Sequence, residues 1–327
     1  MLTLPRFEWS QPVSVTETLG LLSERSGETL VVAGGTDAVP NLKHRLHEPR
    51  RVVHIGRVRE LHFLREEPDG FDFGPLLTLT ELSQHRGVRE ALPALAKAAG
   101  LVAGPQLRNM GTLGGNLCLD TRCTYYNQTY FWREALGFCL KKDGVHCHVV
   151  PQGKRCVAAH SSDVAPVLIA LDAEVEIASR EGRRTLPVDE FFVGDGIHNN
   201  VLAPHELVTR IRVPATARTL RSSYQKVRPR HSIDFPMLSI AVAVRVTAGR
   251  CEDLRVVVSA LAAKPRRVGG LDKLAVGRML DAALIEEVAQ VAYKQCRPQT
   301  SVPYDTDWRH EMVPVYVRRA LNEALGS

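Results

Sequence analysis

The stretch RNMGTLGGN, residues 108–116, decides the fold of this chain because three glycines, Gly111, Gly114 and Gly115, crowd into nine residues. Glycine has no Cβ atom, so the main chain of such a stretch can approach a ligand or another segment closely. The stretch follows an alanine-rich segment, residues 93–102, whose composition favours a helix. We therefore predict a loop that follows a helix and presents its backbone to a bound group.

A second glycine loop stands about 75 residues earlier, in VVAGGTDAVPNLK at residues 31–43. The β-rich run from Thr29 to Ala33 predicts a strand, and Gly34 and Gly35 follow it directly. A loop at the end of a strand directs backbone N–H groups outward, where an anion is the natural ligand. One such loop also fits a plain tight turn, whereas two favour a large phosphate-bearing cofactor that is held from both sides.

Motifs and composition exclude several other classes of protein. Neither loop has the spacing of a Walker loop or of the Gly-x-Gly-x-x-Gly dinucleotide motif, so a doubly wound nucleotide fold is not expected. The net charge of +6 comes from scattered residues without a nucleic-acid-binding motif, although it leaves an acidic protein partner open. No apolar run approaches the roughly 20 residues of a membrane helix, and no leader opens the chain. We expect a cytoplasmic protein that binds neither nucleic acid nor membrane.

The remainder of the chain predicts a mixture of helices and strands. Strands are expected at residues 52–55, 71–79, 174–178 and 204–214. From about residue 219 the alternation predicts an antiparallel sheet, with a hairpin turn at Ala248 and Gly249. Helices are expected at residues 280–295 and 313–325.

Five segments, read in order, carry a family resemblance. They are VVAGGTDAVPNLK (31–43), RNMGTLGGN (108–116), SSDVAPVLIALDAEVEI (161–177), FFVGDG…VLAPHELVTRIRVP (191–214) and YQKVRPRHSIDFPMLSIAVAV (224–244). Together they resemble the FAD-binding medium subunit of molybdenum hydroxylases, the family of xanthine, aldehyde and carbon monoxide dehydrogenases. The resemblance covers essentially the whole chain.

This resemblance implies an α+β fold in two parts. Residues 1–217 would form a PCMH-like FAD-binding α/β domain of two subdomains, and residues 218–327 a small domain of antiparallel sheet and helices. It also implies an oxidoreductase component that assembles with a large molybdopterin subunit and a small 2Fe-2S subunit. Two such heterotrimers would pair.

The resemblance further implies which residues bind FAD and assigns no catalytic residue to this chain. The first loop would bind through Val32, Ala33, Gly34, Gly35, Thr36 and Asp37. The second would bind through Thr112, Leu113, Gly114, Gly115 and Asn116. Asp163 would bond the sugar or ribityl region, Val208 would line the ring pocket, and Lys226 would reach the polar edge of the flavin. From the sequence alone, Lys226 reads as a surface lysine of a strand.

One segment departs from the family pattern. Several relatives place an aromatic residue near the flavin after the Phe-Phe-Val-Gly run, whereas this chain has Asp195 and Gly196 there. The resemblance therefore does not say how the flavin ring is covered at this position.

A cysteine-rich insertion is the second departure. In typical relatives the second glycine loop runs within a few residues into the Ser-Asp segment, whereas here about 40 residues intervene, at about 119–158. They contain Cys123, Cys139, Cys147 and Cys156, with 15, 7 and 8 residues between successive cysteines. Structural zinc sites usually draw their ligands in close pairs, which are missing here.

Well-spaced single cysteines on a wrapping loop fit a 4Fe-4S cluster better, because its irons sit at separate corners. We therefore predict that these four cysteines ligate such a cluster. Two alternatives stay open, namely a mixed zinc site that uses His146 and His148, and packed cysteines without a metal. Cys118, Cys251 and Cys296 are expected to be packed residues.

The insertion narrows the resemblance to the medium subunits of 4-hydroxybenzoyl-CoA reductases, which carry an additional 4Fe-4S cluster. This implies that electrons pass from reduced ferredoxin through the cluster to FAD, and on to the 2Fe-2S clusters and molybdenum, to dehydroxylate 4-hydroxybenzoyl-CoA to benzoyl-CoA. The alternative is the flavin subunit of an oxidising hydroxylase of the xanthine, aldehyde or CO dehydrogenase type, with a structural cysteine or zinc loop. A third hypothesis, an assembly subunit with decayed cofactor loops, is disfavoured by the intact glycine pairs.

Overall fold

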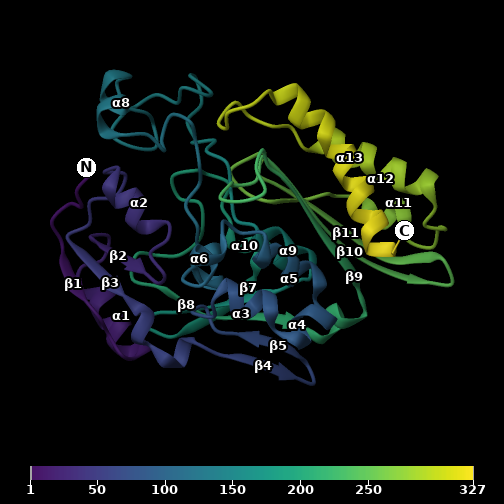
Figure 1. The fold of residues 1–327 in the computed structure, drawn as a ribbon, viewed down its shortest axis with the longest axis horizontal. Helices are drawn as coiled ribbons and strands as arrows, with labels where there is room; N and C mark the ends of the chain where they lie inside the picture. Colours follow the sequence, from purple (N-terminus) through teal and green to yellow (C-terminus); the bar gives the residue numbers. More distant parts are fainter. Residues whose placement is uncertain (1, 327) are drawn as a thin grey trace.

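A computed structural model describes residues 2–326 and arranges them around three β-sheets (Figure 1). The first sheet is parallel, in the order β1 (Glu8–Ser10), β3 (Arg51–His54), β2 (Thr29–Val32). The second is antiparallel, in the order β4 (Leu64–Glu67), β5 (Gly70–Phe73), β8 (Leu207–Pro214), β6 (Glu174–Ala178), β7 (Arg183–Pro187). The third is also antiparallel, in the order β12 (Arg266–Arg267), β11 (Arg250–Ser259), β10 (Leu238–Thr247), β9 (Arg221–Val227).

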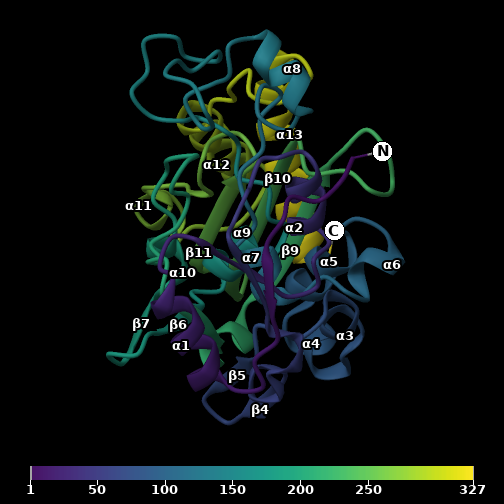
Figure 2. The same ribbon diagram turned by 90° about the vertical axis from the view of Figure 1, so that its left-hand side faces the viewer.

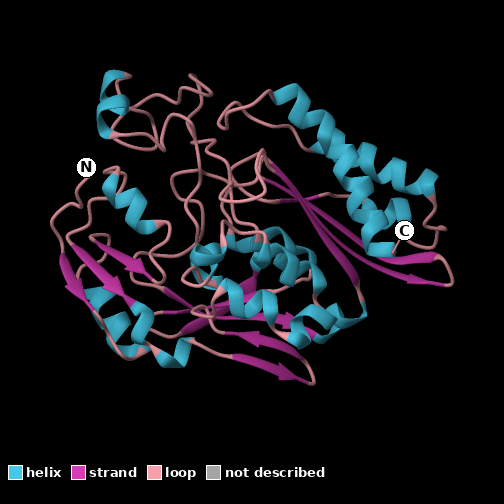
Figure 3. Ribbon diagram, in the orientation of Figure 1, coloured by secondary structure: helices cyan, strands magenta, loops and turns pink. Residues whose placement is uncertain are grey.

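Helices cover these sheets (Figure 3). The α-helices are α1 (Val15–Glu24), α2 (Ala38–Lys43), α3 (Leu79–Gln84), α4 (Arg86–Ala91), α5 (Pro93–Gly100), α6 (Pro105–Arg108), α7 (Leu113–Leu117), α8 (Tyr130–Ala135), α9 (Val164–Ala170), α10 (Val188–Phe191), α11 (Leu271–Ala275), α12 (Ala282–Gln295) and α13 (Thr306–Leu325). Short 3-10 turns lie at η1 (Ile55–Arg57), η2 (Arg59–Leu61) and η3 (Ala215–Thr219). The predicted α+β class, with a C-terminal antiparallel sheet and helices, is confirmed.

Helix α9 lies at the centre of the molecule, and its sequence explains why. All seven of its residues are apolar and buried, so no face of the helix is left for solvent. It packs against α5 on one side and against β10 and β11 on the other, which joins the second and third sheets in one hydrophobic core. The residue that precedes this helix, Asp163, is thereby held deep inside the protein.

Strand β10 serves two cores because alternate side chains of a strand point to opposite faces. Ala241 and Ala243 belong to the central core with α9, whereas Ile240, Val242 and Val244 belong to the C-terminal core. Alanine lets the sheet lie close to α9, and the larger residues fill the space beneath α12 and α13.

Two predicted elements have different limits in the structure. The strand predicted at residues 71–79 ends at Phe73, because Gly74 packs against the carbonyl of Leu61 and Thr78 already caps α3. The helix predicted from residue 313 begins at Thr306, where the Asp305 side chain accepts a 2.6 Å hydrogen bond from the backbone N–H of Trp308. This cap adds two turns that the apolar pattern alone does not show.

The cysteine insertion projects from the body as a loop-rich segment around α8, beside the C-terminal segment that precedes α13 (Figures 1 and 2). The buried Arg133 anchors it, since its guanidinium donates to the carbonyls of His44 and Arg45 just after α2. A backbone bond from the Thr124 N–H to the Ser301 carbonyl, 2.8 Å long, ties it to the C-terminal segment. The insertion therefore rests on the segment that follows α2 and on the segment that precedes α13.

None of the helices found in residues 2–326 combines the length and the apolar character that crossing a membrane would require.

Folding stability should fall in acid because of His160, which lies where the insertion rejoins the body. Its ring is fully buried, and burial lowers its pKa to about 3. The unfolded chain therefore binds one more proton than the folded chain between about pH 6.5 and 3. We expect His160→Gln to lose less stability in this window than the unsubstituted chain, by up to roughly 1.4 kcal/mol per pH unit. Urea unfolding at a series of pH values measures this difference. An equal loss of unfolding free energy in both proteins as the pH falls would contradict it.

Candidate functional site

The two glycine loops cross each other at a direct backbone contact. A Cβ atom built on Gly34 would lie 1.8 Å from the carbonyl oxygen of Met110, so only glycine fits at this position. Gly35 follows with a φ of +71°, a conformation that favours glycine and turns the first loop toward α2. The second loop is fixed by Thr112, whose side chain accepts from the Gly115 N–H at 3.1 Å and caps α7.

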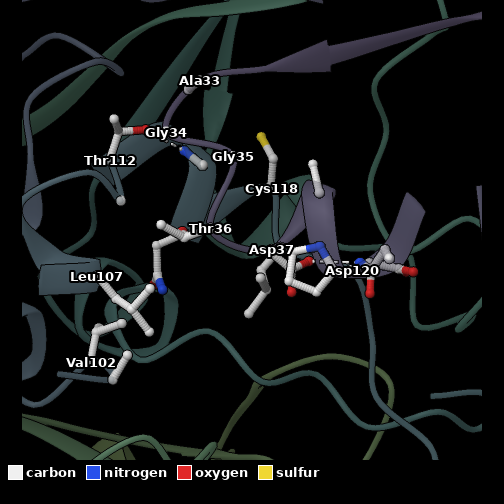
Figure 4. Close-up of a pocket in the computed structure, with 18 of the residues that line it drawn as sticks. Ala33, Gly34, Gly35, Thr36, Asp37, Val102, Leu107, Thr112, Cys118 and Asp120 are labelled. Carbon is white, nitrogen blue, oxygen red and sulfur yellow. Dashed lines mark hydrogen bonds between the residues drawn. The ribbon is translucent and has the colours of Figure 1, made fainter. Parts of the chain in front are cut away.

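A cavity of about 420 Å³ opens at this crossing (Figure 4). Ten of the fourteen residues that the resemblance assigns to FAD line it, which are Val32, Ala33, Gly34, Gly35, Thr36, Asp37, Thr112, Gly115, Asn116 and Asp163. They come from three segments that lie far apart in the sequence. That these residues contact a flavin stays a prediction.

The other four assigned residues lie behind the wall of the cavity. Leu113 and Val208 are buried in the central core, and a Cβ atom on Gly114 would meet Pro75. Val208 is held there because it pairs with Ile177 in the second sheet and faces the packed interior. The fourth residue, Lys226, does not line the cavity but forms an ion pair with Asp163, which does.

Asp163 and Lys226 form a buried ion pair at the floor of the cavity. The Lys226 Nζ lies 2.8 Å from Asp163 Oδ2 and also donates to the Leu101 carbonyl at 3.1 Å. The hydroxyl of the buried Tyr224 donates to Asp163 Oδ1 at 2.6 Å. Burial raises the pKa of Asp163 and lowers that of Lys226, and their pairing opposes both shifts. The surface position that the sequence alone suggests for Lys226 is wrong, because its side chain is only 1% exposed.

The cavity fits a phosphate-bearing cofactor. The backbone N–H groups of Gly34 and Thr36, which line it, have no hydrogen-bond partner within residues 2–326. Backbone N–H groups seldom stay unpaired in a protein interior, so these donors are available to a bound anion. The apolar wall near Val102 and Leu107 offers a surface for a planar ring (Figure 4).

Several lining residues were not predicted from the sequence, and two groups of them lie within or beside the quoted motifs. One comprises Cys118, Leu119, Asp120 and Arg122, directly after the second loop, and the other runs from Ile233 to Phe235. Cys118, which was expected only to be packed, lines the cavity as well, and burial raises the pKa of its thiol to about 12. Proximity to RNMGTLGGN could have indicated the first group, and the motif at 224–244 contains the second.

The four cysteines of the insertion surround one smaller cavity. Cys123, Cys139, Cys147 and Cys156 all line it, and none is part of a disulfide. Backbone N–H groups of Val150 and Ala158 donate to the sulfurs of Cys147 and Cys156, each at 3.4 Å. Burial raises the pKa of Cys123 to about 12 and that of Cys156 to about 11. The loop thus brings together residues up to 33 positions apart.

These thiols are not arranged around a single ion. Across residues 2–326, no group of three or more His, Cys, Asp or Glu side chains has the geometry to hold a metal ion. The Nε2 atom of His148 lies 2.6 Å from the Phe138 carbonyl, and His146 is exposed. A zinc site that uses these histidines is therefore not supported, and a cluster at the four cysteines stays a prediction.

Lys141 joins the cysteine cavity to the larger one. It lines the cysteine cavity, and its Nζ lies 2.6 Å from Asp120 Oδ1, on a residue that lines the larger cavity. The same Nζ donates to the Thr121 hydroxyl at 2.6 Å and to the Gly196 carbonyl at 2.7 Å. The two cavities therefore share one wall.

Asp195 and Gly196, which depart from the family pattern, pack on the insertion instead of the larger cavity. Asp195 Oδ1 accepts from the Cys156 N–H at 3.3 Å, and the Gly196 N–H donates to the Cys156 carbonyl at 2.8 Å. Neither residue lines the larger cavity, whose nearest aromatic cover is Phe235. The two residues that depart from the family pattern therefore contact the cysteine insertion.

Comparison with known proteins gives matches along the whole chain. The family model described as the FAD binding domain in molybdopterin dehydrogenase matches residues 5–216. The model of the CO dehydrogenase flavoprotein C-terminal domain matches residues 222–324.

Individual relatives agree with these models. The carbon monoxide dehydrogenase medium chain of Hydrogenophaga pseudoflava is 29% identical over 98% of this chain and 97% of its own length. The nicotine 6-hydroxylase medium subunit of Paenarthrobacter nicotinovorans is 27% identical over 98% of both chains. The solved structure of the Hydrogenophaga carbon monoxide dehydrogenase that lacks the Mo-pyranopterin moiety superimposes with a TM-score of 0.81 over 99% of both chains, at 28% identity.

Gly34→Ala should separate the two glycine loops, because its methyl group would overlap the Met110 carbonyl. We expect FAD affinity to fall at least tenfold, measured by quenching of flavin fluorescence on the full chain. Gly20→Ala is the matched control, since no atom lies within 4 Å of its added methyl group. Equal FAD affinity in both variants would contradict the role of the contact between the two glycine loops in FAD binding.

Gly196→Ala should displace Cys156, because a Cβ atom there would lie 2.6 Å from its sulfur. In the metal-free protein we expect one thiol to react faster with Ellman's reagent, and this gain should vanish when Cys156→Ser is added. Gly269→Ala serves as the control, since its methyl group would meet only an ordinary contact at 3.8 Å. An unchanged reaction rate in Gly196→Ala would count against the contact.

Proposed function

Because this chain belongs to the FAD-binding medium subunits of the molybdenum hydroxylase family, we propose that it holds FAD at the crossing of its glycine loops and transfers electrons within an oxidising enzyme of that family. The observation that carries the proposal is the cavity lined by both loops, where the backbone N–H groups of Gly34 and Thr36 have no hydrogen-bond partner within residues 2–326. When bound there, FAD would supply one- and two-electron redox chemistry.

The residues of the chain would bind and orient this cofactor. Backbone N–H groups of Gly34 and Thr36 would donate to the diphosphate, which costs little entropy because no long side chain must be ordered. Asp163 would accept from hydroxyl groups of the cofactor while Lys226 and Tyr224 hold its carboxylate in place. The positive charge of Lys226 would then lie close to the cofactor without touching solvent, and would stabilise added negative charge.

The relatives support the oxidising type. Their names describe dehydrogenases and hydroxylases, and the chain spans nearly their whole length. We propose that the chain likewise assembles with a large molybdopterin subunit and a small 2Fe-2S subunit, two such heterotrimers pairing. We also propose that the chain divides at residues 217 and 218, near the boundary between the two matched family models.

A second candidate is favoured by the four thiols around one cavity. In this candidate Cys123, Cys139, Cys147 and Cys156 hold a 4Fe-4S cluster, and electrons from reduced ferredoxin enter through the insertion. The enzyme would then be a 4-hydroxybenzoyl-CoA reductase. Lys154 and Arg155 are exposed basic residues of the insertion, and such residues fit an acidic donor.

Iron and acid-labile sulfide per flavin, measured on the anaerobically purified complex, separate the two candidates. About four of each per FAD in excess of the 2Fe-2S content of the small subunit, lost in Cys123→Ser and in Cys147→Ser but kept in Cys251→Ser, would favour the reductive candidate. The control is apt because Cys251 is buried in the C-terminal core, far from the insertion. FAD without iron at these cysteines would favour the oxidising enzyme, and a folded complex without extractable flavin would contradict both.

A further inference from the structure

Arg122 brings a cation from the cysteine insertion into the larger cavity. It directly precedes Cys123, which faces the cysteine cavity, yet its own side chain lines the larger one. Its guanidinium forms an ion pair with Asp37 of the first glycine loop, and its Nη1 donates to Asn41 Oδ1 at 3.3 Å. The guanidinium carbon lies 4.4 Å from the ring centre of Phe235.

The charges around the cavity give this arginine its importance. Among the described residues that line the cavity, Arg122 is the only lysine or arginine, whereas four aspartates, Asp37, Asp120, Asp163 and Asp234, are present. FAD carries two negative charges on its diphosphate. Asp120, Asp163 and Asp234 each pair with a lysine or arginine that is not part of the lining. Arg122 is therefore the cation of the lining that can approach the diphosphate.

The guanidinium has donors to spare. Five N–H groups belong to an arginine side chain, and Asp37 and Asn41 do not engage them all, since the buried Nε has no hydrogen-bond partner within residues 2–326. Burial lowers the pKa of Arg122 to about 10, so the side chain remains charged at neutral pH. A buried guanidinium with a free donor is well suited to a phosphate oxygen.

We propose that Arg122 binds the diphosphate of FAD, so that the cysteine insertion supplies the main counter-charge of the cofactor. The inference rests on the proposed function, because it takes FAD as the occupant of the cavity. The backbone keeps the side chain in place, as Arg122 exchanges hydrogen bonds of 2.8 and 2.7 Å with Ala159 across the base of the insertion. The insertion thus contributes to FAD binding whether or not its own cavity holds a cluster.

The test compares three ligands on the full chain freed of flavin. FAD and ADP carry the diphosphate, whereas riboflavin presents only the ring and ribityl chain. We expect Arg122→Met to weaken FAD and ADP about 10- to 100-fold and to leave riboflavin within about twofold, since a charged hydrogen bond is lost only for the first two. Arg122→Lys should lose less, because it keeps the charge without the planar fork.

Arg155→Met is the matched control. Arg155 directly precedes Cys156, as Arg122 precedes Cys123, but it is exposed and lies outside the larger cavity. FAD affinity should be unchanged in this variant. Unchanged FAD and ADP affinity in Arg122→Met, or an equal loss for riboflavin, would overturn the role of Arg122 in binding the diphosphate. Failure of the unsubstituted chain to bind FAD at all would instead overturn the proposed function.

Discussion

The contact between the main chain of Gly34 and the carbonyl of Met110 is the constraint on which the rest of the site depends. It brings a loop that ends a parallel strand against a loop that begins a helix, and the cavity exists only where these two backbones meet. A side chain on Gly34 would overlap the Met110 carbonyl oxygen and force the loops apart. The glycines therefore shape the space, and the unpaired N–H groups beside them give it an affinity for anions.

The cysteine insertion is an integral part of this site. It leaves the second glycine loop at Cys118 and returns at Ser161, both of which line the larger cavity. Between these points, Lys141 reaches back to Asp120, and Tyr126 donates to the other oxygen of the same carboxylate at 3.0 Å. The two cavities are thus linked by a short hydrogen-bonded network around Asp120.

The sequence predicted the parts of the site that depend on local backbone chemistry. Both glycine loops could be located because clustered glycines indicate a close approach of the backbone. The four cysteines could be grouped because they stand at wide intervals within one inserted segment. The sequence did not locate Arg122, since its role depends on the return of Ala159 and on the position of Asp37. Val208 was assigned to the cavity but faces the core, because its partner in the sheet fixes which face of the strand it occupies. The early start of α13 was missed because its cap precedes the apolar pattern.

Residues of the body of the protein are fitted to the insertion, which indicates that the insertion has a role. Gly196 belongs to the body of the protein, yet the absence of a side chain there makes room for the sulfur of Cys156. Its carbonyl accepts from both Thr121 and Lys141, and its N–H donates to the Cys156 carbonyl, so one short loop supports both ends of the insertion. A loop without a role would not require a fitted glycine in the body of the protein that it contacts. The shared wall and the fitted glycine argue against an assembly subunit with decayed loops, because the body of the protein is fitted to the insertion.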